Sequence, residues 1–94
     1  MSSVESDRVV RVTLKDGLPV PDQDPVKVKK DNQKVRWSAD FDFKITVDGY
    51  TDIKYSSGGG EYSAKSGVFS TVKQYKYTIS AGGVENDPVL DIEP

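Results

Sequence analysis

The stretch that decides the fold is KVRWSADFDFKITV, residues 34–47. At its start Val35 and Trp37 fall on one side of an extended chain, and within residues 43–47 the Phe, Ile and Val do the same. Successive side chains of a β-strand point to opposite faces of a sheet, so this alternation predicts two strands that each bury one face. Residues 38–42 are mostly polar and predict a short link between the two strands.

Alternation of the same kind continues on both sides of this stretch. Further strands are predicted at residues 8–14, 26–29, 75–79 and 89–92, with shorter ones around Ile53 and from Val68. Residues 18–25 contain three prolines and predict an extended edge connection, because proline cannot donate a hydrogen bond to a sheet. About eight short strands without a long helical period predict an all-β, antiparallel Greek-key sandwich.

Two neighbouring segments depart from this alternation. Residues 56–60, with the sequence SSGGG, predict a flexible loop, since glycine has more backbone freedom than any other residue. Residues 61–66 predict a single helical turn. These segments separate the central strands from the C-terminal ones.

The composition bounds what the chain can do. Its 94 residues are enough for one domain, predicted at residues 8–94 after a flexible N-terminus at residues 1–7. The net charge of -2 gives no reason to expect nucleic acid or an anionic membrane as a partner. The chain has no His and no Cys, which excludes His-based triads, thiol catalysis, disulfides and zinc–thiolate sites. We therefore expect a protein that is not an enzyme and uses no cofactor.

The inward positions of the predicted strands define an expected core. Its members are Val10, Val12, Leu14, Val28, Val35, Trp37, Phe43, Ile45, Val47, Tyr75, Tyr77, Ile79, Leu90 and Ile92. Trp37 is the single tryptophan and the expected centre of this core, because aromatic side chains bury the most area in a small domain.

Several of these segments together resemble the cupredoxin family of copper-binding β-sandwiches. The run KVRW at residues 34–37 and the strand beginning at Phe43 are similar to the family's Val-x-Trp run and the strand carrying its first His ligand. YKYTI at residues 75–79 is similar to the family's Tyr-x-Tyr-x-Cys motif, followed by residues 80–87 in place of the ligand loop and residues 88–92 as the final strand. The resemblance implies a cupredoxin-like sandwich of seven or eight strands, and an immunoglobulin-like sandwich is the alternative.

The residues that bind copper in that family have no counterpart here. The resemblance places Phe43 near the first His position and Ile79 at the Cys position, and residues 80–87 contain neither His nor Met. A copper site of this type uses two His, one Cys and a weakly bound Met. The resemblance therefore implies the fold without the metal, with a packed apolar end where the copper would lie.

Loop carboxylates are the first candidate site. Asp22 and Asp24 form one Asp-x-Asp pair, and Asp40 and Asp42 form another. Calcium takes six to eight oxygen ligands, often from loop carboxylates, although no twelve-residue calcium loop is present. Aspartate also favours turns through its own side-chain hydrogen bonds. A weak calcium site at Asp40 and Asp42 is therefore one interpretation, and solvated turn residues are the other.

A basic hairpin is the second candidate site. Residues 26–29 and 34–37 are predicted to pair around a turn at residues 31–33. On its outward face this hairpin would carry Lys27, Lys29, Lys34 and Arg36. Such a face could attract an anionic ligand or an acidic partner. Lysines on a sheet edge also prevent aggregation, and the acids of the C-terminal segment could neutralise them, so both interpretations stay open.

Three tyrosines around the glycine-rich segment, Tyr50, Tyr55 and Tyr62, are the third candidate. Tyrosine beside a Gly/Ser loop suits recognition, because it offers a rigid ring with a polar tip. Aromatic rings near sheet ends also serve as lids over a small core. Together the candidates favour a non-catalytic binding or interaction module. The alternative is a small calcium- or anion-binding protein.

The expected partner is a protein or a small molecule, with no nucleic acid and no membrane, and the expected state is a monomer. The first residues lack the basic and apolar regions of a signal peptide. Together with the absence of cysteine, this slightly favours a cytoplasmic location unless a leader precedes the chain.

Overall fold

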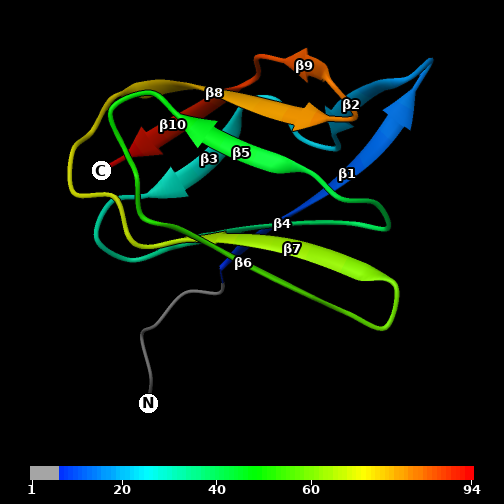
Figure 1. Cartoon of the computed structure of the whole chain (residues 1–94). Coiled ribbons are helices and arrows are strands. Elements are labelled where there is room, and N and C mark those ends of the chain that lie inside the picture. Colours follow the sequence, from blue (N-terminus) through cyan, green and yellow to red (C-terminus); the bar gives the residue numbers. More distant parts are fainter. Residues whose placement is uncertain (1–6) are drawn as a thin grey trace.

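The computed structural model describes residues 7–94, which form ten β-strands joined by turns and loops (Figure 1). The strands are β1 (Arg8–Lys15), β2 (Leu18–Pro21), β3 (Val26–Lys29), β4 (Val35–Ala39), β5 (Lys44–Val47), β6 (Ile53–Gly58), β7 (Glu61–Ser66), β8 (Gln74–Ala81), β9 (Val84–Asn86) and β10 (Val89–Glu93). The predicted all-β class is confirmed. The predicted flexible N-terminus lies, apart from Asp7, outside the described residues. No helix between residues 7 and 94 is long and apolar enough to cross a membrane.

The strands assemble into two sheets that lie as two layers (Figure 1). The first sheet has the order β2-β1-β4-β7-β6, and the second has the order β3-β10-β8-β5 with β9 beside β8. β1 runs parallel to β4 and β3 runs parallel to β10, whereas the other pairs are antiparallel. The sheets are therefore mixed, and the prediction of a purely antiparallel sandwich is wrong on this point. Parallel pairing is possible because these partners are joined by long crossings and not by tight turns.

The predicted basic hairpin is also wrong. Residues 26–29 form β3, which pairs with β10, whereas β4 lies between β1 and β7 in the other sheet. The chain between them crosses from one sheet to the other, and the backbone N–H of Lys29 donates to Gln33 Oε1 there (2.9 Å). Alternation predicts which face of each strand is buried, but it does not say which strand lies beside it.

Residues 53–66 form a continuous hairpin in place of the predicted loop and helical turn. Ile53 to Gly58 pair in register with Ser66 back to Glu61. Gly59 and Gly60 form the two-residue turn with φ values of 60° and 79°, the conformation that matches the twist of a hairpin. β7 pairs with β4 on its other side, so both neighbours hold this segment as a strand. The glycines make a tight turn here and not a flexible loop.

The inward side chains of both sheets form one hydrophobic core. Its buried members are Val10, Val12, Val26, Val28, Val35, Trp37, Ala39, Phe43, Ile45, Val47, Ala64, Phe69, Tyr77, Ile79, Ala81, Leu90 and Ile92. Most residues of the expected core are among them. Residues 18–21 form the edge strand β2, as the prolines predicted.

Two residues of the expected core are not fully buried. One residue that is buried lies in a loop and not in the strand predicted for it. Leu14 is 52% exposed, because β4 pairs with β1 only up to Arg11 and the end of β1 has β2 as its single neighbouring strand. Tyr75 is partly buried and packs against the core from its margin. Phe69 is buried, but it lies in the loop before β8 and not in the strand predicted from Val68.

Trp37 and Tyr77 occupy the centre of the core. Their ring centroids are 5.3 Å apart, and both side chains are fully buried. Within the described residues, neither the indole nitrogen nor the Tyr77 hydroxyl makes a hydrogen bond. Burial raises the pKa of the Tyr77 hydroxyl far above its usual value, and the proximity of the indole N–H lowers this pKa only in part. Tyr77 therefore stays protonated throughout the neutral range.

Candidate functional site

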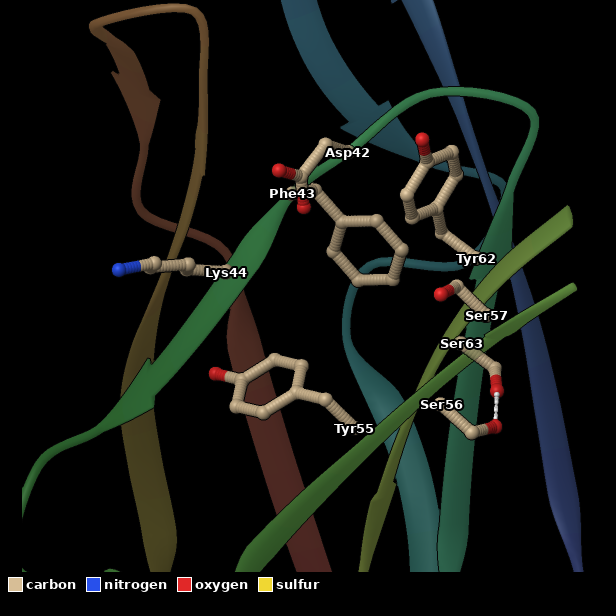
Figure 2. Close-up of a pocket in the computed structure, with 8 residues that line it drawn as sticks. All are labelled: Asp42, Phe43, Lys44, Tyr55, Ser56, Ser57, Tyr62 and Ser63. Carbon is tan, nitrogen blue, oxygen red and sulfur yellow. Dashed lines mark hydrogen bonds between the residues drawn. The ribbon is translucent and has the colours of Figure 1, made fainter.

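A groove opens on the side of the sandwich where β5 of the second sheet faces the β6–β7 hairpin of the first (Figure 2). Its volume is about 300 Å³. It is lined by Asp42, Phe43, Lys44, Tyr55, Ser56, Ser57, Tyr62 and Ser63. Two of the three tyrosines that the sequence singled out, Tyr55 and Tyr62, therefore lie in one site.

Tyr55 connects the two sheets across this groove. Its hydroxyl accepts a hydrogen bond from the backbone N–H of Ile45 and donates one to the Ile45 carbonyl, both at 3.0 Å. β5 ends its sheet on this side, so the tyrosine satisfies backbone groups that would otherwise be open to another strand. Its side chain is nevertheless 51% exposed. Tyr55 thus protects the β5 edge while offering ring surface to a ligand.

The rest of the groove combines an apolar floor with a polar rim. Phe43 is buried and forms the floor, and Tyr62 is partly buried beside it (Figure 2). Asp42, Lys44 and Ser57 are exposed around the opening. Binding sites for small molecules typically have this composition, in which apolar rings supply contact area and a few polar groups fix orientation.

Tyr50 lies apart from the groove and covers the core. Its ring stacks on Phe69 with the centroids 4.3 Å apart, and its hydroxyl accepts a hydrogen bond from the Gly67 N–H at 2.8 Å. Burial raises the pKa of this hydroxyl, and the hydrogen bond from Gly67 lowers it in part. Of the two roles that the sequence left open for the tyrosines, Tyr50 therefore fits the lid, whereas recognition by Tyr55 and Tyr62 stays a prediction.

The four basic residues of the predicted hairpin are divided between the sheets. Lys27 and Lys29 lie on the outer face of the second sheet, opposite Asp91 and Glu93 of β10. Lys34 precedes β4 and Arg36 lies within it, so both belong to the first sheet. The structure therefore does not bring these four cations together.

Two cations that the sequence analysis missed lie beside Arg36. In the register of the first sheet, Arg36 is opposite Lys65 of β7, and Lys65 is opposite Lys54 of β6. A Gly-Gly turn at residues 59–60 pairs position 54 with position 65, so assigning a hairpin to these glycines would have placed Lys54 opposite Lys65. The contact with Arg36 depends on β4 lying next to β7, which no local signal indicates.

The carboxylates of the predicted calcium site remain exposed. Asp40 lies just after β4, and Asp42 lies at the rim of the groove. Across the part of the chain that the structure describes, no three or more His, Cys, Asp or Glu side chains gather into a group that could hold a metal ion. The calcium site stays a prediction, and the positions of Asp40 and Asp42 give it no further support.

The end of the sandwich at which the resemblance places copper lies around Phe43 and Ile79, where β5 pairs with β8. β5 pairs with β8 so that Ile45 lies opposite Ile79 and Lys44 opposite Ser80. Phe43 and Ile79, which stand near the family's His and Cys positions, are 4% and 0% exposed. Both residues are therefore buried, and Phe43 also forms the floor of the groove.

Comparison with family models and with curated proteins gives no relative from which a function could be carried over. No protein-family model matches the chain, and no curated protein matches it. Its function has to be argued from the groove and the surfaces described above.

Proposed function

We propose that this protein is a non-catalytic binding module built on a metal-free, cupredoxin-like Greek-key sandwich. The observation that carries the proposal is the groove at β5, β6 and β7, whose rings and polar rim are held by the body of the fold. Its shape and chemistry fit a small, uncharged ring that carries hydroxyl groups, such as a sugar ring. The C–H face of such a ring packs on Tyr55 and Tyr62, while its hydroxyls reach Asp42 and Ser57.

The arrangement of the strands supports the cupredoxin-like assignment over the immunoglobulin-like one. Three of the strands that contain the resembling segments are neighbours, since β5 lies next to β8 and β8 lies next to β10, whereas β4 lies in the other sheet. Each sheet also contains a parallel pair, β1 with β4 and β3 with β10. The immunoglobulin-like sandwich is built from two antiparallel sheets. The parallel pairs therefore favour the cupredoxin-like sandwich.

The chemistry of the side chains supports binding without catalysis. The chain has no His and no Cys. The tyrosines whose pKa values are shifted, Tyr50 and Tyr77, are shifted upward and away from neutrality, which makes them weaker acids. A general base in a hydrolytic or proton-transfer enzyme needs a pKa near the working pH, so neither tyrosine meets that requirement.

The experiment is a titration of the isotope-labelled protein with neutral mono- and disaccharides, followed by amide chemical shifts. We expect saturable shifts at residues 42–44, 55–57 and 62–63, with a dissociation constant of about 1 mM, as suits a shallow site. Tyr62→Ala should weaken this binding at least fivefold, while Val72→Ala, an exposed change elsewhere, should leave it unchanged. Shifts that stay absent up to about 10 mM sugar, or that spread evenly over the surface, contradict the proposal.

A further inference from the structure

The outer face of the first sheet carries a row of three cations on adjacent strands. Arg36 of β4, Lys65 of β7 and Lys54 of β6 are successive partners in the register, and all three side chains are exposed. Neighbouring strands lie about 4.8 Å apart, so the row spans about 10 Å across the sheet. We call Arg36, Lys54 and Lys65 the basic row.

No ion pair within the described residues neutralises the basic row. Within residues 7–94 the ion pairs are Arg11 with Glu61 and Lys30 with Asp31, and none reaches a residue of the basic row. The three side chains also make no hydrogen bond within this part of the chain. Like charges directly opposite one another destabilise a sheet. The row is therefore unfavourable for the folded protein alone and needs another explanation.

Two simpler explanations do not account for the row. Composition does not force it, because on the second sheet the same chain places Lys27 opposite Asp91 and Lys29 opposite Glu93. Protection of a sheet edge against aggregation explains Lys54, since β6 is an edge strand. It does not explain the other two members of the row, which lie on the interior strands β4 and β7.

The surface next to the row is polar and slightly hollowed. Ser38, Ser63 and Ser56 form the adjacent row across the same strands, with the hydroxyls of Ser56 and Ser63 2.9 Å apart. Two shallow depressions of about 300 and 160 Å³ are lined by side chains of the two rows and their neighbours. In the second depression Lys34 adds a fourth cation and Asp52 a single carboxylate.

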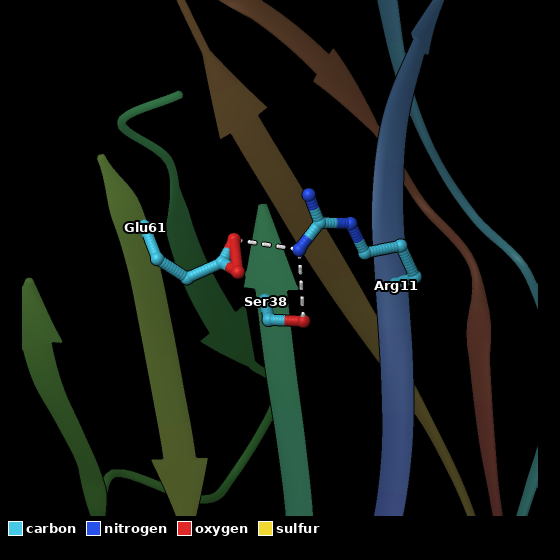
Figure 3. A network of polar contacts seen from close by, with 3 residues as sticks. All are labelled: Arg11, Ser38 and Glu61. Atoms are coloured by element: carbon cyan, nitrogen blue, oxygen red, sulfur yellow. Dashed lines mark hydrogen bonds and ion pairs between the residues drawn. The ribbon is translucent and has the colours of Figure 1, made fainter. Parts of the chain in front are cut away.

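Beyond the serine row the charges of this face are paired. Arg11 of β1 reaches across β4, and its Nη1 lies 2.6 Å from Glu61 Oε1 and 3.5 Å from the Ser38 hydroxyl (Figure 3). The face is therefore neutralised near the Gly59-Gly60 turn and positively charged towards the other end of the strands. An anion on this face is therefore attracted most strongly to the basic row.

We propose that the basic row and the serines beside it bind an elongated polyanion whose charges are tetrahedral oxyanions, either phosphate or sulfate groups. Arg36 can donate two parallel hydrogen bonds to such a group, and Lys54 and Lys65 supply point charges on the neighbouring strands. Serine hydroxyls donate to the remaining oxygens. Tyr55 is the single aromatic residue among those lining the two depressions, whereas surfaces that bind single-stranded nucleic acid stack successive bases on several aromatic rings. The larger depression shares Tyr55, Ser56 and Ser63 with the groove. The proposal rests on the three cations of the basic row, which lie outside the groove lining, and does not depend on the proposed function.

The test measures binding of sodium polyphosphate and of dextran sulfate at low and at physiological salt, with uncharged dextran as the blank. We expect binding by the wild type that weakens steeply with salt, because a protein that neutralises a polyanion releases its counterions. Lys65→Gln should weaken the binding at least fivefold. Lys27→Gln, which removes the same charge from the second sheet, should change it less than twofold.

The outcomes distinguish phosphate from sulfate as the recognised group, and some of them contradict the proposal. Preference for polyphosphate identifies phosphate as the recognised group, and preference for dextran sulfate identifies sulfate. Equal losses in the two glutamine variants show attraction by net charge alone and overturn the proposal, as does the absence of binding at low salt. Tighter binding of a single-stranded oligodeoxynucleotide than of either polyanion at equal charge also overturns it. Melting temperatures of both variants well above the temperature of the binding assay exclude unfolding as the cause of a loss.

Discussion

The two outer faces of the sandwich arrange similar residues in opposite ways. On the second sheet, Lys27 and Lys29 of β3 lie opposite the two acids of β10. On the first sheet, the basic row places Arg36, Lys65 and Lys54 opposite one another. Both faces cover the same core, and their lysines are similarly exposed. What differs is which strands lie side by side, so pairing decides whether the same kind of residue is neutralised or left to attract a ligand.

The difference in cross-strand charge pairing between the two faces is small compared with the stability of the whole domain. A cross-strand pair contributes about 0.2–1 kcal/mol, whereas a whole domain is stable by about 5–15 kcal/mol. A protein of this size can therefore keep an unfavourable row on one face while the shared core holds both sheets together. The predictions below first test the shared core, then the contact between the sheets, and finally the two faces.

The largest effect is expected for Trp37→Ala. Removal of this fully buried ring should lower the free energy of unfolding by about 3–5 kcal/mol, because a cavity is left at the centre of the core. Since both sheets share that core, amide signals of β3 and of β6 should disappear at the same urea concentration. Separate transitions for the two sheets, or a melting temperature close to that of the wild type, would contradict a single core.

The next effect is expected for Tyr55→Phe. Loss of the two hydrogen bonds to Ile45 should lower the free energy of unfolding by about 1–2 kcal/mol and open the β5 edge. Tyr62→Phe is the matched control, because within the described residues its hydroxyl makes no hydrogen bond, and it should change stability by less than about 0.5 kcal/mol. Equal effects of the two changes in chemical denaturation would show that the contact between the sheets does not depend on Tyr55.

Tyr77→Phe should alter how stability depends on alkaline pH. In the unfolded chain tyrosine loses its proton near pH 10, whereas the pKa of buried Tyr77 is far higher, so above about pH 10 the folded state binds more protons. Stability of the wild type should therefore fall as pH rises beyond that point, by about 1.4 kcal/mol per pH unit from this residue. In the phenylalanine variant this part of the slope should vanish, while stability at pH 7 should change little or rise. Urea denaturation at pH 7, 10 and 11 measures both; an unchanged slope would rule out the assigned pKa shift.

The smallest effects come from exchanging the charge patterns of the two faces. Lys65→Glu places an acid between Arg36 and Lys54 and should raise the free energy of unfolding by about 0.2–1 kcal/mol. Asp91→Lys places a cation opposite Lys27 and should lower it by a similar amount. Both effects should shrink at about 1 M salt, where exposed charges are screened within about 3 Å. If the two changes shift the melting temperature in the same direction, the contrast between the faces is not electrostatic.

Much of the core could be predicted from local alternation. The inward positions of residues 35–37, 43–47 and 77–79 are buried as expected, because the two-residue period of a strand is a property of the chain itself. The exposed Leu14 shows the limit of this argument. Its position in the alternation is correct, but β4 does not extend to that end of β1, which pairs with β2 alone.

The candidate sites could be predicted only in part. The sequence singled out Tyr55, Tyr62 and Arg36, which now belong to the groove and the basic row. It missed Lys54 and Lys65, because the segment that contains Lys65 was predicted to be a helical turn. It also grouped Lys27 and Lys29 with Arg36, although the chain between them crosses to the other sheet.

The sequence by itself determined that the chain forms short strands with one apolar face, that Trp37 is buried, and that His and Cys chemistry is excluded. Only the tertiary structure decided which strands are neighbours, and with them the groove at β5 and the basic row. The physical reason is that side-chain alternation is local, whereas strand pairing joins segments that are far apart in the chain and is selected by how two complete sheets close around one core.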